Sequence, residues 1–297
     1  MSAKSKHKYI RNRFELMDVV ILIFLIIHAI VIIVPFISVI GTSFATQREA
    51  AASKLMLFPT KEPTIDNYYR LFQDPRIAIG YKTTSLILLI GVPVNIFLTT
   101  SLAYGMTKTN YPGAKVIFYL ILLTMLFNGG IVPVYLLMMQ LGLIDTLWSV
   151  IFAYGVNTFY FIIMRTYMIS LPDSLVESAK IDGAGEWRIL FRIILPLSKP
   201  ILATVLLFFA VDRWNEWFNA MIFLRRKDLI PLQLVLRNIV MDATIVGSLS
   251  IAGPRVPRFT EGIQCATIMV TMVPVMCFFP FLQKYFVKGI MIGAIKA

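Results

Sequence analysis

Charged residues, cysteines and histidines are scarce in this chain. Of its 297 residues only 15% are charged, and it contains two cysteines and two histidines. Soluble domains carry about 25% charged residues, so the low value argues against a soluble protein. Cys265 and Cys277 stand roughly 18 Å apart if one helix carries both, which is too far for a disulfide. His7 and His28 are too few and too distant in sequence for a metal site, and His28 is expected to be satisfied by helix packing.

Motifs of the common catalytic and nucleotide-binding sites are also missing. The sequence has no Gly-Lys dipeptide, so it has no phosphate-binding loop of the form G-x-x-x-x-G-K-[ST]. It likewise lacks an H-E-x-x-H zinc pair, a G-x-S-x-G nucleophile elbow and a dinucleotide-binding G-x-G-x-x-G. We therefore expect no catalytic residue, no metal and no cofactor in this chain, and no ATPase site of its own.

Apolar sequence, by contrast, is abundant. Hydrophobic residues make up 58% of the chain, against about 45–50% in soluble domains. A membrane-spanning helix needs about 20 mostly apolar residues, because the hydrocarbon core is about 30 Å thick. Six segments meet this requirement, at about 19–40, 83–106, 115–139, 146–168, 200–224 and 265–286. The sequence therefore predicts an all-α integral membrane protein that forms a single transmembrane domain over residues 1–297.

Basic residues set the expected orientation of these spans. The chain has 28 Lys and Arg against 16 Asp and Glu, a net charge of +12. The basic residues lie between apolar runs rather than along one face, so they indicate membrane orientation and not a nucleic-acid partner. Residues 1–18 are rich in Lys and Arg and are predicted to be cytoplasmic. Six spans then place the 169–199 loop and the 287–297 tail on the same side, although the long outer loops are basic too.

The 169–199 loop differs from a simple connector because it is long and amphipathic. Ser174 and Glu177 have the spacing of a capping box, so a short helix is predicted to begin there. Gly183 and Gly185 permit the left-handed turn that would end it.

The second half of this loop, 186–194, is predicted to be another short helix, and Pro196 limits how it continues. Two short helices at an angle would make a compact knob at the membrane edge. Alternatively, the pair lies flat among the lipid headgroups and Glu177 only caps its helix.

The spacing within this loop resembles the cytoplasmic EAA loop of ABC importer permeases. That pattern is Glu-Ala-Ala, three residues, Gly, nine residues, Ile, one residue and then Leu-Pro. The residues at these positions here are Glu177, Ser178, Ala179, Gly183, Ile193, Leu195 and Pro196. Ser178 in place of the first Ala is the one departure, and it exchanges one small residue for another.

Further stretches extend the resemblance over nearly the whole chain. Residues 127–135 and 141–146 resemble the third-span region of carbohydrate permeases, 214–217 resembles a fifth-span segment, and 283–297 resembles their tail. The chain is identified as similar to the second permease of maltose-type importers, closest to the LplC/YtcP branch, which is associated with complex oligosaccharides including pectin-derived ones. The resemblance implies the six-helix type I importer (MetI-like) fold with a coupling-helix loop.

The same resemblance implies a function and a set of partners. The chain would be the permease subunit of an ATP-driven importer of a carbohydrate in the bacterial cytoplasmic membrane. Its partners would be a second, different permease, two ABC ATPase subunits that bind ATP and Mg, and an extracytoplasmic sugar-binding protein. The residues implied to couple it to the ATPase are Glu177, Ser178, Ala179, Asp182, Gly183, Ala184, Gly185, Ile193 and Pro196.

Polar groups inside a bilayer usually face the bundle interior or a water-filled cavity. The largest cluster lies in the fifth span, where helical spacing is expected to place Asp212, Asn215, Glu216 and Asn219 along one stripe. Arg213 is expected to reach Asp212 or Glu216 only after rotamer adjustment. The candidates for a substrate path are Asp212, Arg213, Trp214, Asn215, Glu216, Trp217, Asn219, Asn128, Tyr135, Tyr154, Asn157 and Tyr160.

Each of these groups has an alternative role. The fifth-span cluster could serve gating or subunit packing, and the residues of the third and fourth spans could form helix–helix hydrogen bonds. The pair Gly129-Gly130 either lets backbones approach closely or breaks the third span. The outer loops 41–82 and 225–263 are expected to meet the binding protein, the first as an ordered cap and the second with a short helix at 232–241.

Other functions remain open on the sequence alone. An ion-coupled secondary transporter would predict ionisable residues in several spans and interrupted repeats, whereas the acids here concentrate in one span. A membrane-embedded enzyme would need a catalytic constellation. An ABC permease for a solute other than a sugar fits the 169–199 loop equally well.

Overall fold

The computed structural model describes residues 16–52, 56, 61–108, 111–248 and 261–294, and every element assigned within them is a helix. The all-α prediction is therefore confirmed for this part of the chain. The predicted cytoplasmic N-terminus lies outside the described residues except for 16–18, and the end of the predicted tail, 295–297, lies outside them too.

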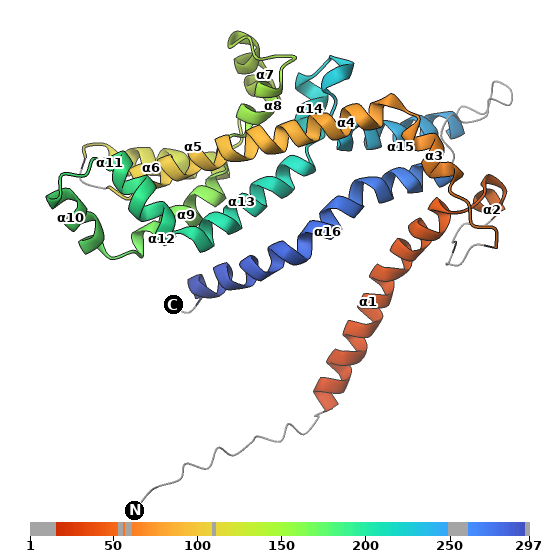
Figure 1. The fold of residues 1–297 in the computed structure, drawn as a ribbon, viewed down its shortest axis with the longest axis horizontal. Coiled ribbons are helices and arrows are strands. Elements are labelled where there is room, and N and C mark those ends of the chain that lie inside the picture. The colour runs from red at the N-terminus through yellow and green to blue at the C-terminus, as the bar shows by residue number, and fades with distance from the viewer. Residues whose placement is uncertain (1–15, 53–55, 57–60, 109–110, 249–260, 295–297) are drawn as a thin grey trace, which may run out of the picture.

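Three long helical runs form the body of the molecule (Figure 1). The first is the continuous run Pro75–Gly105, in which a π-helical turn joins α4 and α5. The second is α13 and the third is α16, and both lie along the first run and contact each other. Their bounds are α4 Pro75–Leu86, η1 Ile87–Gly91, α5 Val92–Gly105, α13 Lys199–Trp214 and α16 Glu261–Ala294.

The predicted third, fourth and fifth spans are each interrupted. The third divides into α6 (Ala114–Leu126) and α7 (Ile131–Gln140), which meet at 120°, and the fourth into α8 (Leu147–Ala153) and α9 (Thr158–Ile169), at 58°. In the fifth, α13 ends at Trp214 and α14 (Phe218–Phe223) follows. The segments 146–168 and 200–224 are therefore not single continuous helices, and 115–139 is broken as well, which is one of the two outcomes expected at Gly129-Gly130.

Local backbone chemistry explains two of these breaks. Gly130 has a φ of +85°, and its N–H donates to the side-chain oxygen of Asn128 at 2.9 Å. The expected break at Gly129-Gly130 is therefore confirmed. Before α9, Asn157 has an extended backbone and its side chain accepts from the N–H groups of Phe159 and Tyr160, which is the bonding of an N-cap.

Two described helices are long and apolar enough to cross a membrane by themselves, Met17–Ser43 and Pro75–Gly105. The number rises to five when each bent helix pair counts as one span. α16 adds a further apolar stretch over Glu261–Cys277.

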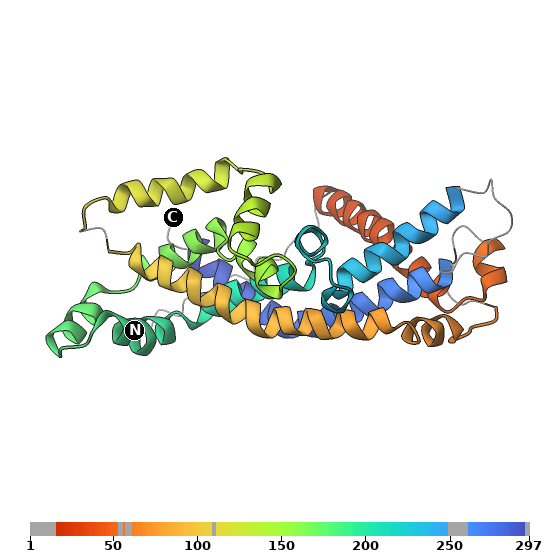
Figure 2. The same cartoon turned by 90° about the horizontal axis from the view of Figure 1, so that it is seen from above.

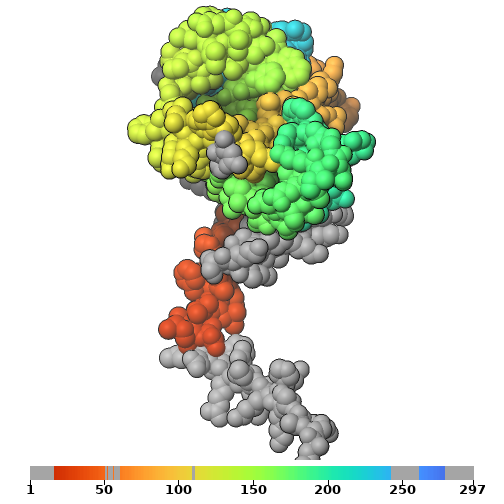
Figure 3. Space-filling view, turned by 90° about the vertical axis from the view of Figure 1, so that its left-hand side faces the viewer, coloured from red at the N-terminus to blue at the C-terminus, as the bar shows by residue number. Residues whose placement is uncertain are grey.

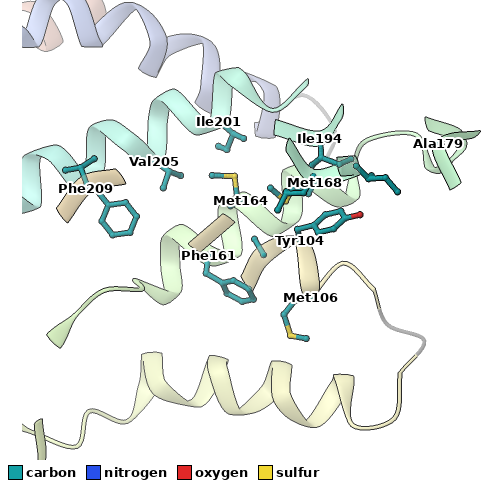
Figure 4. Packing of buried hydrophobic residues seen from close by; sticks show 14 residues of the cluster. Tyr104, Met106, Phe161, Met164, Met168, Ala179, Ile194, Ile201, Val205 and Phe209 are labelled. Carbon is teal, nitrogen blue, oxygen red and sulfur yellow. The ribbon is translucent and has the colours of Figure 1, made fainter. Parts of the chain in front are cut away.

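Two hydrophobic cores occupy opposite ends of the body. One packs α5, α9 and α13 against the 169–199 loop around Phe161, Met164 and Val205 (Figure 4). The other packs α3 (Asp66–Phe72), α4 and α16 around Leu232 of α15. Seen from above, the helices of the 169–199 loop lie at one end of the molecule and α3 and α15 lie at the other (Figure 2).

The two long loops are helical where they are described. The 41–82 loop forms α2 (Gln47–Ala52) and α3, and the buried side chain of Asn67 ties it down by donating to the backbone oxygens of Ser43 and Ala45. The expectation of an ordered segment is confirmed there. The helix predicted at 232–241 is confirmed and extends further, as α15 (Leu232–Ser248).

α1 (Leu16–Ser43) stands apart from the rest of the chain (Figures 1 and 3). None of its most apolar 18-residue window is buried, and its contacts with α16 lie near its C-terminal end. His28 stacks on Phe24 of its own helix, with 6.1 Å between ring centroids. His28 thus contacts a neighbour on α1, where the sequence predicted packing between helices.

Candidate functional site

The helix that carries the Glu-Ser-Ala sequence is α10, Asp173–Ile181. Its N-cap is Pro172, at φ −61° and ψ 127°, and no side-chain hydrogen bond caps it. The predicted capping box of Ser174 and Glu177 is therefore wrong. The helix begins before Ser174 because the extended backbone ends at Pro172, so Ser174 already lies in the first turn.

A Schellman motif ends α10. Gly183 has a φ of +75°, its N–H donates to the Lys180 oxygen at 3.0 Å, and the Ala184 N–H donates to the Ala179 oxygen at 2.9 Å. These are the two bonds that define the motif, so the predicted left-handed turn is confirmed at Gly183. At Gly185 it is wrong, because φ is −70° there and the residue starts the next helix.

The second arm of the loop is longer than predicted. It runs through α11 (Glu186–Ile189), the π-helical turn η2 (Leu190–Ile194) and α12 (Leu195–Leu197), and so continues past Pro196. The chain then bends by 88° into α13. The 169–199 loop is thus two helical arms joined by the turn at Gly183, as the sequence predicts in outline.

The residues implied to couple the loop to the ATPase differ in burial. Ala179 is buried in the core (Figure 4), Ala184 and Ile193 are half-buried, and the exposed members are Glu177, Ser178, Asp182, Gly183, Gly185 and Pro196. Beside them Ile181 is 86% exposed, and it is not among the residues implied by the resemblance. Val176 and Ala179 share one face of α10 at i,i+3 spacing, and Ile181 falls outside that spacing. This spacing could have predicted from the sequence that Ile181 is exposed.

Glu186 joins the loop to α5, in the long helical run Pro75–Gly105. Its Oε1 lies 2.8 Å from the Lys180 Nζ of α10, its Oε2 accepts from the Tyr104 hydroxyl of α5, and Lys108 Nζ is 3.9 Å away. The bonds from Lys180 and Tyr104 lower the pKa of the Glu186 carboxyl. No sequence motif pointed to this cluster, because its members are far apart in the chain.

The polar cluster of the fifth span does not form one stripe. α13 ends at Trp214 and α14 begins at Phe218, so Asp212 and Asn219 belong to different helices. Asn219 folds back locally and donates its backbone and side-chain N–H groups to the Glu216 carboxylate. The helical-stripe prediction is wrong because this helix break intervenes.

Arg213 is 3% exposed and every nitrogen of its guanidinium is hydrogen-bonded. Nε donates to Asn95 Oδ1 of α5 at 3.0 Å, and Nη1 lies 3.3 Å from Glu216 Oε2. The other bonds go to the backbone oxygens of Val150, Ile151 and Tyr154 at the end of α8. Arg213 therefore satisfies the free carbonyls at the break in the fourth span, and of its two predicted partners it pairs with Glu216.

The remaining candidates are dispersed. The Trp214 indole donates to the Thr271 oxygen of α16, Asn215 accepts from Gln233, and Trp217 lies under the Arg237 guanidinium. Tyr154 contributes its carbonyl to Arg213, and the Tyr135 hydroxyl accepts from Arg225. The Tyr160 hydroxyl donates to Asp212 at 2.8 Å, and this pair lies on an exposed face of the helices.

Asn128 and Asn157 hold local turns, as described above. Among the described residues, no group of three or more His, Cys, Asp or Glu is placed to hold a metal ion. The structure thus gathers the buried Arg213 and Glu216 with the half-buried Asn219, and it pairs the exposed Asp212 with the half-buried Tyr160.

Comparison with known proteins assigns this arrangement to a family. Residues 11–224 match the model of the binding-protein-dependent transport system inner membrane component. The chain is 37% identical to the polygalacturonan/rhamnogalacturonan transport system permease protein YtcP of Bacillus subtilis, over 96% of this chain and 99% of the other. It is 38% identical to the protein LplC of the same organism, over 89% of each chain.

A solved structure agrees with the sequence comparison. A bacterial ABC transporter involved in the import of the acidic polysaccharide alginate contains a chain that superposes with a TM-score of 0.81 at 31% identity, covering 91% of this chain and 96% of that one. The resemblance inferred from the loop spacing is therefore confirmed. The chain belongs to the family of inner membrane components of binding-protein-dependent transport systems.

Proposed function

We propose that this chain is a permease subunit of an ATP-driven importer that moves an oligosaccharide across the cytoplasmic membrane by alternating access. The family match and the carbohydrate transporters among the relatives support this proposal. YtcP is named for the transport of polygalacturonan and rhamnogalacturonan, and the solved transporter is involved in the import of alginate. These polysaccharides contain uronic acids. We therefore propose an acidic oligosaccharide as the substrate.

The observation that carries the proposal is the shape of the 169–199 loop. α10 lies at one extreme end of the molecule, as Figures 1 and 2 show. Its exposed side presents Glu177, Ser178 and Asp182 next to the exposed Ile181, while Ala179 anchors it to the core. An apolar side chain surrounded by polar ones on a projecting helix fits a protein partner better than a lipid headgroup layer.

That partner is an ABC ATPase, which binds the ATP and Mg, and a second, different permease and a sugar-binding protein complete the assembly. The pairs α6–α7 and α8–α9, then α13 with α14, and α16 act as spans together with α1 and Pro75–Gly105, which gives six spans with both chain ends in the cytoplasm. Asp212 is exposed and its partner Tyr160 is half-buried, so this pair is the best-placed candidate for the sugar path.

The test of coupling uses the complete complex, reconstituted with its ATPase and binding protein. Gly183→Asp strains a backbone at φ +75°, and Glu177→Lys reverses an exposed charge. Both variants should uncouple ATP hydrolysis from uptake while the protein stays in the membrane. Ser178→Ala, which restores the family's residue, is the matched control. Normal uptake by either uncoupling variant at normal abundance would contradict the proposal.

The test of substrate starts from gentle solubilisation of a tagged chain and mass spectrometry of the proteins that copurify. A second permease, a P-loop ATPase and a binding protein are expected. The binding protein is then titrated with oligogalacturonides and with neutral oligosaccharides of equal length. Preference for the neutral sugars would overturn the acidic-substrate proposal, and recovery of the chain alone would overturn the importer proposal.

A further inference from the structure

Glu186 is the point where both arms of the 169–199 loop meet α5 of the long run Pro75–Gly105. It is the first residue of α11 and lies three residues after the turn at Gly183. Its two carboxylate oxygens have different partners, Lys180 of α10 on Oε1 and the Tyr104 hydroxyl of α5 on Oε2. One side chain therefore links α10, α11 and α5.

Aromatic packing supports the same junction. Phe97 of α5 stacks on Trp187 of α11, with 6.2 Å between centroids and 10° between planes, and on Phe191 at 6.5 Å. Stacked rings attract one another over a range of offsets, so they hold the helices together without fixing their angle. Charge-assisted hydrogen bonds are directional, and the Glu186 bonds supply the fixed point that the rings lack.

The distances along the chain make this link mechanically distinct. Tyr104 and Glu186 are 82 residues apart in sequence, so a movement of α10 reaches α5 through the Glu186 contact far more directly than through the backbone. Lys180 lies on the last turn of α10, next to the exposed end at Ile181. A push on that end therefore acts close to the bond with Glu186.

We propose that Glu186 is a positioning residue that sets the angle between α10 and α5, so that displacement of α10 by the ATPase moves the long helical run Pro75–Gly105. This inference rests on the proposed function. Glu186 acts through Lys180 and Tyr104. Lys108, 3.9 Å away, adds a second positive charge on the side of α5.

The experiment uses the complete reconstituted complex and measures sugar molecules imported per ATP hydrolysed. Glu186→Gln weakens the bond to Lys180, and Tyr104→Phe removes the other bond while keeping the ring. Loss of one such half-exposed bond should reduce the imported-to-hydrolysed ratio about 2- to 5-fold in each variant. Tyr119→Phe, at an exposed tyrosine of α6, is the matched control for Tyr104→Phe and should leave the ratio unchanged.

Rescue separates positioning from folding. Glu186→Asp keeps a carboxylate at this position and should retain part of the ratio, whereas Glu186→Ala should not. Unchanged ratios in Glu186→Gln and Tyr104→Phe would overturn the inference, and so would equal ratios in Glu186→Asp and Glu186→Ala. Gly183→Asp in the same preparation distinguishes the failures: if it too leaves coupling intact, the proposed role of the whole loop is wrong.

Discussion

At the scale of single residues, Gly80 shows how closely two helices can approach. A Cβ added there would lie 2.9 Å from the Leu232 Cα and 3.2 Å from its nitrogen. These atoms are backbone, and the Leu232 N–H is held by Thr84 Oγ1 at 2.9 Å. The first turn of α15 therefore cannot move aside without losing a hydrogen bond.

Gly80→Ala should lower the free energy of unfolding by about 1–3 kcal/mol, the usual cost of overpacking. Thermal unfolding of the purified protein in detergent measures it. Gly105→Ala is the matched control, because a Cβ there meets nothing within 4 Å, and it should be neutral or slightly stabilising. Equal melting temperatures for the two variants would show that α4 and α15 separate easily.

Asp145 is a second residue whose role depends on one contact. It has a φ of +65°, and its Oδ1 accepts from the backbone N–H groups of Arg226 and Arg225 at 2.8 Å each. These bonds lower the pKa of its carboxyl. A carboxyl with a lowered native pKa stabilises the fold above its unfolded pKa of about 3.9 and loses that contribution as the pH falls through its native pKa.

Asp145→Ala should therefore lower the melting temperature at pH 7, and the difference from the parent should shrink as the pH falls below about 4. Melting curves of both proteins from pH 7 to pH 3 measure this. Asp145→Asn keeps an acceptor oxygen and tolerates the left-handed backbone, so it should lie between the two at pH 7. A difference that stays constant with pH would exclude the carboxylate as the cause.

At the scale of helices, the breaks in the spans are held by specific bonds. The α8–α9 break leaves carbonyl groups of the last turn of α8 free, and Arg213 of α13 donates to three of them. The same guanidinium bonds Asn95 of α5 and Glu216. One buried side chain thus connects the second, fourth and fifth predicted spans.

Arg213→Met should destabilise the protein by about 3–5 kcal/mol, because it leaves Glu216 as a buried charge without its partner. Thermal unfolding in detergent and abundance in the membrane both report the loss. Arg70→Met, at an exposed arginine on α3, is the control and should have little effect. A variant at position 213 as stable as the control would mean that water satisfies the α8 carbonyls.

These breaks also show what sequence reasoning can reach. Gly130 and its Asn128 cap are local, so the break in the third span was foreseeable from Gly129-Gly130. The break after Trp214 and the burial of Arg213 were not, because they depend on Val150 and Asn95, more than 60 residues away. The turn at Gly183 was also predictable, because it depends on a glycine within the turn itself. The bond between Glu186 and Tyr104 was not, because these residues are 82 positions apart in the sequence.

At the scale of the whole molecule, the chain is elongated and its two described ends differ. The 169–199 loop and its core form one end, and α3 and α15 form the other (Figures 1 and 2). Figure 3 looks onto the loop end and shows α1 separate from the main body. An apolar helix without an intrachain partner along most of its length is expected to lie against lipid or a second subunit.

If the long axis of the molecule crosses the membrane, reporter proteins fused at its two ends must indicate opposite sides of the membrane. A fluorescent protein fused after Asp182 should fluoresce, because it folds in the cytoplasm, and alkaline phosphatase fused after Lys227 should be active outside. The reciprocal fusions should both be silent. Two positions that report the same side would show that the number of spans between them is even, contrary to the proposed topology.

The buried Arg213 has a consequence for how the protein is made. An arginine at the centre of a membrane helix costs about 2.5–3.5 kcal/mol on insertion, so α13 is a poor helix for the lipid by itself. Asn95 and the α8 carbonyls that receive its guanidinium precede it in the chain. The ribosome therefore delivers the acceptors before the donor, so the groups that satisfy the guanidinium are already synthesised when α13 emerges.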